Sequence, residues 1–148
     1  MSPARQFYVC RLEEIDNAVL HQQRTGYHAI SLIAGNTPGA VSTLRFCNPQ
    51  GPLAGEPLPK KQAGFACYFN PAFLSAGMHD MLQSLPMFKK GTSPVYFLNP
   101  AQGSHIRRLF EKMLEEVNNN YIYKYELLGN YLATIIHQVL KIQPSIRE

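Results

Sequence analysis

The pattern of apolar positions in the last third of the chain predicts two amphipathic helices. Apolar residues recur every three or four positions, the spacing of one helix face, at Ile106, Leu109, Phe110, Met113, Leu114 and Val117. Beyond a polar tripeptide at 118–120, the same spacing returns at Ile122, Tyr125, Leu128, Leu132, Ile135, Ile136 and Val139. We therefore expect helices over about 100–118 and 121–142, joined as an αα-hairpin.

Asn-Pro pairs mark two helix starts. In Asn99-Pro100, the asparagine can cap a helix whose first residue is proline, and Gln102 is placed to complete a capping box. Asn70-Pro71 repeats the start signal and predicts a short helix near 71–76 that Gly77 can end.

The first two thirds of the chain carry short runs with the composition of strands. β-Branched, aromatic and other apolar residues gather at 7–12, 27–33, 41–47, 64–69 and 94–98, separated by glycine- and proline-rich connections. Strands followed by helices are typical of an α+β domain, here a small sandwich or open barrel. We expect residues 1–98 to form the β-rich part and 99–143 the two-helix part of the same domain.

Composition and charge narrow the class of protein. A chain of 148 residues with 45% hydrophobic and 16% charged residues is typical of one globular domain. No apolar run has membrane-spanning length and the first ten residues lack a signal-peptide core, so we expect a cytoplasmic protein without membrane contact. The net charge of +4 comes from scattered basic pairs rather than a basic stripe, so we expect no direct DNA binding by this chain.

The residue types that carry catalysis or bind metals form no recognisable pattern. None of the five histidines pairs at ligand spacing with another histidine or with a cysteine. Cys10, Cys47 and Cys67 are widely spaced and predict small buried thiols on strands. The segment 35–43, GNTPGAVST, lacks the lysine and glycine spacing of a phosphate loop and predicts a hairpin turn. We expect no catalytic residue, no metal and no cofactor.

Two sets of residues are candidates for binding. Aromatic side chains on neighbouring strands could line an apolar ligand cavity with an arginine as polar anchor; the alternative is that they are core facing the helices. The candidates for this site are Tyr27, Arg45, Phe46 and Tyr68. The apolar stripe of the second helix, with its tyrosines, suits a dimer contact, and edge-of-core packing is the alternative. The candidates for this contact are Leu128, Tyr131, Leu132, Ile135, Ile136 and Val139.

Longer segments resemble the regulatory half of AraC-type transcription regulators, most closely the versions found in Bacteroidetes-like bacteria. The resemblance spans about residues 27–143 and lies in the segments RFCNPQGPLAGEPL, GFACYFNPAFL, LPMFKKGTSPVYFLNPAQ, IRRLFEKMLEE and YIYKYELLGNYLATIIHQVLKIQP. It implies a cupin-like β-barrel that senses a small effector, then two helices of which the second commonly supplies the dimer contact. It also implies a DNA-binding domain of two helix-turn-helix units, which we expect to lie outside this chain.

This sequence departs from the family pattern between Ile33 and Val41, where a short turn replaces the usual extra hairpin. The barrel is therefore expected to be incomplete or open on one side. We expect an effector-sensing and homodimerising domain that reaches DNA only through the helix-turn-helix half. The alternatives are a stand-alone protein-interaction module and a small metal-independent cupin enzyme, whose turnover would depend on His28 or Tyr68.

Overall fold

An open antiparallel sheet forms one layer of the protein. The computed structural model describes residues 7–14, 27–34, 41–47, 63–70, 73–74, 77–78, 80, 85 and 95–142. Within them, five strands lie in the order β1-β4-β2-β3-β5, and the sheet does not close into a barrel. The strands are β1 (Phe7–Arg11), β2 (His28–Ile33), β3 (Ser42–Cys47), β4 (Gly64–Phe69) and β5 (Val95–Leu98), with a short helix η2 (Leu12–Glu14) after β1.

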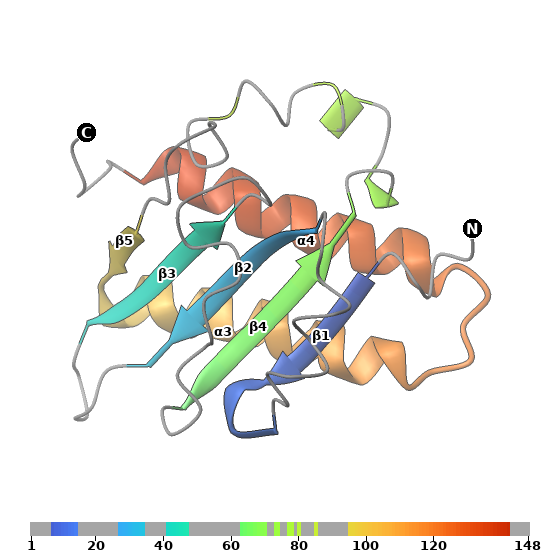
Figure 1. Cartoon of the computed structure of the whole chain (residues 1–148), viewed down its shortest axis with the longest axis horizontal. Coiled ribbons are helices and arrows are strands. Elements are labelled where there is room, and N and C mark those ends of the chain that lie inside the picture. Colours follow the sequence, from blue (N-terminus) through green and yellow to red (C-terminus); the bar gives the residue numbers. More distant parts are fainter. Residues whose placement is uncertain are drawn as a thin grey trace.

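Two long helices, α3 (Pro100–Val117) and α4 (Lys124–Lys141), cover one face of the sheet (Figure 1). The predicted capping box opens α3: the Asn99 side chain accepts from the Gln102 backbone N–H at 2.8 Å, and the Gln102 side chain accepts from that of Asn99 at 2.9 Å. At the other end, the Lys124 ammonium donates to the carbonyl oxygens of Val117 (3.1 Å) and Asn119 (3.0 Å). Lys124 thus places its charge at the negative end of α3.

The main core lies between this face of the sheet and the helices. Alternate residues of each strand point toward the helices, as the period of two requires, and meet the apolar stripes of α3 and α4. The Phe65 and Phe110 rings stack with centroids 5.5 Å apart and join β4 to α3. Phe73 stacks on Phe7 at 4.8 Å and meets Tyr125 of α4 edge-on at 6.4 Å. Strands and helices therefore share one core.

The opposite face of the sheet, which we call the far face, carries a second and smaller apolar cluster. Cys10, Leu12, Ala66 and Tyr68 are buried there, each at most 5% exposed. Partly buried residues packed against them are Tyr27, Ala29 and Ile33. The sheet thus has buried side chains on both faces, although the long helices cover only one.

The predicted α+β class is confirmed, with strands and long helices in the predicted order. β2 and β3 pair antiparallel, with Ile33 opposite Thr43, as expected of a hairpin. The residues of the predicted turn between them and those of the loop at 48–59 lie outside the described residues. The second helix begins at Lys124 rather than near 121. The prediction that Gly77 ends a short helix near 71–76 is wrong, because Gly77 is itself helical, as are Met78 and Asp80.

Candidate functional site

The four residues predicted to bind a ligand do not lie on one face of the sheet. Phe46 points toward the helices, is fully buried and meets Tyr96 edge-on with ring centroids 5.7 Å apart. Arg45 precedes Phe46 on β3 and therefore points to the far face. Phe46 is therefore part of the main core, the alternative that the sequence left open, and it lies on the opposite face of the sheet from Arg45.

The other three candidates, Tyr27, Arg45 and Tyr68, lie on the far face. Tyr68 is 2% exposed and belongs to the far-face cluster, and Tyr27 packs against that cluster. Between Tyr68 on β4 and Arg45 on β3 runs β2, whose side chains on this face are Ala29 and Ser31, both small, and Ile33 beyond them. Tyr68 and Arg45 are thus two strands apart and offset by two residues along the strands, which places their Cα atoms about 12 Å apart with Ala29 and Ser31 between them.

Ser31 completes this group and was not predicted from the sequence. It lies directly opposite both Arg45 and Ala66 in the sheet register, and it is only 4% exposed. A buried serine on a strand is a polar group that folding has to accommodate. Alternation with Ile30 and Leu32 places Ser31 on the far face, but only the strand register shows that it faces Arg45.

The Arg45 side chain is incompletely paired. Its Nε atom is buried from solvent and has no hydrogen-bond partner within the described part of the chain. Leaving a buried donor unpaired costs about 1–3 kcal/mol, and more when the group is charged. Arg45 therefore brings an unused donor to the far face.

The stripe predicted to form a dimer contact is instead part of the chain's own core. Leu128, Leu132, Ile135, Ile136 and Val139 are each at most 1% exposed. Tyr131 is half-buried and packs against the same core. A stripe with helical spacing predicts a buried face, but it does not say whether the same chain or a partner buries it. These five side chains form no surface that a second copy could contact.

Most of the exposed large apolar side chains of the helical part lie at the connection between α3 and α4; the exception within the described helices is Leu140, 39% exposed near the end of α4. Ile122 is 81% exposed, and its neighbours Tyr121 and Tyr123 are each about half exposed. The two tyrosine rings meet edge-on with centroids 5.7 Å apart. We call residues 121–123 the hairpin apex. Three consecutive exposed large apolar side chains are typical of a contact surface.

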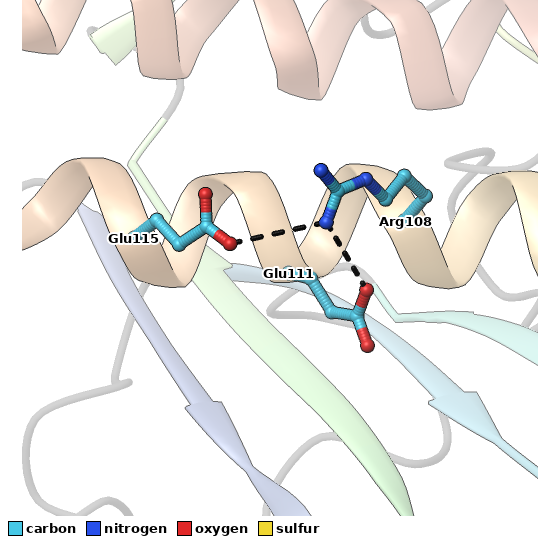
Figure 2. A network of polar contacts seen from close by, with 3 residues as sticks. All are labelled: Arg108, Glu111 and Glu115. Carbon is cyan, nitrogen blue, oxygen red and sulfur yellow. Dashed lines mark ion pairs between the residues drawn. The ribbon is translucent and has the colours of Figure 1, made fainter.

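The basic pair Arg107-Arg108 lies on the exposed side of α3. Figure 2 shows Arg108 between two carboxylates of its own helix, Glu111 at 3.6 Å and Glu115 at 3.8 Å. Arg108 is 59% exposed, so each pair contributes at most about 1 kcal/mol to stability. Two neighbouring carboxylates also oppose the approach of a nucleic-acid phosphate to Arg108.

Two titratable side chains on the helix side of the sheet have displaced pKa values. Burial lowers the pKa of His28, which stacks on Phe69 at 5.5 Å, from its usual 6.5 to about 4. Burial also raises the pKa of the Cys67 thiol, which is fully buried in the main core. Cys67 is therefore a protonated apolar residue at neutral pH, and Cys10 is likewise a buried thiol, as predicted. The Cys47 side chain lies outside the described residues.

His28 should make the protein less stable as the pH falls from about 6.5 to about 4. In this window the unfolded chain binds a proton at His28 that the folded chain does not. Between pH 7 and pH 5 we expect His28 to account for about 1 kcal/mol of lost unfolding free energy, allowing for its partial exposure. Urea denaturation of wild type, His28→Gln and the control His137→Gln at both pH values measures this loss. An equal loss in wild type and His28→Gln would contradict it.

Metal ligands and membrane spans were sought within the same described residues. They contain no group of three or more histidine, cysteine or acidic side chains placed to hold a metal ion. No described helix is both long and apolar enough to cross a bilayer.

The far-face group of Tyr27, Ser31, Arg45 and Tyr68 is the candidate functional site. It combines a cation with an unused donor, a serine hydroxyl and two tyrosines on a partly buried surface. Such a set can hydrogen-bond a small polar molecule and cover its apolar parts. Comparison with known proteins adds no assignment, since no protein-family model and no curated protein matches the chain.

Proposed function

We propose that this chain is the effector-sensing and dimerisation domain of an AraC-like transcription regulator. The observation that carries the proposal is the far-face group, set on an open sheet whose other face packs on a helix pair. The resemblance of residues 27–143 to AraC-type regulatory halves supports it. DNA would be bound by a helix-turn-helix domain outside this chain.

The proposal includes a cupin-like architecture, in which the described sheet is one wall of a small barrel or sandwich. Supporting it, Cys10, Ala66 and Tyr68 on the far face are at most 5% exposed, although the long helices lie on the other side. A wall of a barrel or sandwich has buried side chains on its inner face.

The sheet offers a direct route from a bound effector to the helices. Neighbouring residues of β4 point to opposite faces, so Tyr68 belongs to the candidate site while Phe65 stacks on Phe110 of α3. A shift of β4 upon effector binding would therefore move the packing of α3. Regulation further requires that the effector bind two arrangements of the dimer with different affinities.

We propose that the dimer contact lies at the hairpin apex rather than on the buried stripe of α4. The apex has the exposed apolar side chains that the inner stripe lacks, and Ile122 is the most exposed of them. The outward side of α4 carries polar residues such as Glu126, Asn130 and His137, which suit solvent.

Fusion of the chain to a DNA-binding domain that occupies its operator only as a dimer tests this function. We expect the fusion to repress a reporter about tenfold or more relative to the DNA-binding domain alone. Ile122→Asp should abolish repression, because a carboxylate buried at an apolar contact has no partner. Asn130→Asp, which adds the same charge to an exposed position of α4, should leave repression intact.

Sedimentation equilibrium of the unfused chain measures the same contact without a reporter. A monomer at all concentrations, together with no repression, would overturn the dimerisation proposal. Repression that survives Ile122→Asp would place the contact elsewhere. A circular dichroism melt of Ile122→Asp shows whether the variant remains folded.

A further inference from the structure

The geometry points to a small organic anion as the effector, bound through a carboxylate or phosphate group by Arg45 with Ser31 beside it. The inference rests on the proposed function, because it names the chemical class of ligand for the same site. It is carried by the unused donor of Arg45, the register of the strands and the charge on the far face.

The unused donor is the first observation. Arg45 Nε is buried and has no hydrogen-bond partner among the described residues. An arginine presents Nε and one terminal nitrogen along one edge, and this pair of N–H groups matches the two oxygens of a carboxylate or phosphate. A neutral ligand could accept from these groups but would leave the charge without a counterion.

The strand register supplies the second donor. Ser31 lies directly across from Arg45, which places the two Cβ atoms about 5 Å apart. The serine hydroxyl can donate to the same anion. Beyond Ser31, Ala66 is fully buried and small, so no long side chain from that position of β4 covers the group.

The charge on the far face is the third observation. Among the described strand residues on this face, Arg45 is the only charged one, and none is acidic. The other arginine of the described strands, Arg11, lies on the helix side, with its guanidinium 5.1 Å from the centre of the Phe65 ring. The positive charge of Arg45 therefore has no acidic side chain beside it among the described strand residues of this face.

Tyr68 and Tyr27 suggest how the rest of the ligand is held. Tyr68 belongs to the far-face cluster and Tyr27 packs against it, and the Cα atom of Tyr68 lies about 12 Å from that of Arg45 across Ala29 and Ser31 of β2. Because the arginine and tyrosine side chains are themselves several ångströms long, a small organic molecule with its anionic group at Arg45 can bridge the remaining distance. Its remaining atoms would contact the aromatic bodies of the tyrosines.

Titration of the chain with inorganic phosphate and with succinate, at constant ionic strength maintained with chloride, tests the inference. We expect at least one anion to shift the Arg45 Nε–Hε cross-peak in ¹⁵N spectra along a saturable curve. The same anion should also raise the melting temperature. Arg45→Gln should increase the anion concentration at the midpoint of this rise about ten- to hundredfold. Arg45→Lys keeps the charge but loses the paired N–H donors, so it should increase the midpoint anion concentration about tenfold.

Arg107→Gln removes the same charge from the exposed side of α3 and is the matched control. It should bind both anions as wild type does. A response to phosphate alone assigns the site to phosphate esters, and a response to succinate alone assigns it to carboxylic acids.

Two results would overturn the inference: no saturable response of wild type to either anion, or a response that Arg45→Gln retains in full. The wild-type cross-peak reports on anion binding at Arg45 even where a variant fails to fold. The reporter fusion tests dimerisation separately. Dimerisation without an anion response would contradict the ligand inference but not the proposed dimerisation. An anion response without dimerisation would contradict the proposed function but not anion binding at Arg45.

Discussion

Leu132→Lys is expected to unfold the protein. Leu132 is fully buried at the centre of the α4 stripe, in contact with the core that strands and helices share. Lysine at this position would place an ammonium group among apolar side chains with no partner and would also remove the packing of the leucine. The combined cost of about 5 kcal/mol or more approaches the whole stability of a domain of this size.

Circular dichroism and size-exclusion chromatography of wild type and variant check this expectation. His137→Lys is the matched control, because it introduces the same charge at an exposed position of the same helix and should change the unfolding free energy by less than about 0.5 kcal/mol. A folded, monomeric Leu132→Lys protein with near wild-type stability would instead place the stripe at a dimer contact. That result would restore the assignment made from the sequence.

Local patterns were sufficient to predict the elements of this fold. Strand composition located β1 to β5 to within about two residues, because alternating apolar residues and turn-forming connections are properties of short segments. The capping box at Asn99 and Gln102 located the start of α3, because the signal and the hydrogen bonds lie within four residues. The second helix begins later than predicted because Tyr121 to Tyr123, despite their apolar character, form a turn.

The candidate site was predicted only in part, because it depends on the pairing of distant strands. The alternation of Arg45 and Phe46 along β3 already separates them, so placing both in one site contradicted the period of a strand. Ser31 could not be assigned beside Arg45 from its own segment, because that proximity comes from the register of β2 on β3. The sequence left open whether the α4 stripe is core or dimer contact, because periodicity shows burial and not which chain provides it.

Among the glycines that the structure describes, Gly64 is the one where substitution by alanine is expected to be most damaging. Gly64 begins β4 with a φ of +156° and pairs with Ile33 of β2. A Cβ there would overlap the backbone oxygen of Leu32 and would lie 2.8 Å from Leu12 Cδ1. The leucine side chain can move, but the Leu32 oxygen belongs to the central strand and can retreat only if the β2–β4 pairing opens.

We expect Gly64→Ala to lower the unfolding free energy by about 3 kcal/mol or more, because strain in the backbone adds to the steric overlap. Gly129→Ala is the matched control inside α4, where a Cβ would meet its nearest neighbour, Phe73 Cε2, at an ordinary 3.8 Å. The control substitution should raise the unfolding free energy by about 0.5–1 kcal/mol, because alanine has a higher helix propensity than glycine. Urea denaturation followed by circular dichroism compares both with wild type. Equal midpoints for Gly64→Ala and wild type would show that β4 does not approach Leu32 this closely, and the β2–β4 register, which places Ala66 opposite Ser31, would then need revision.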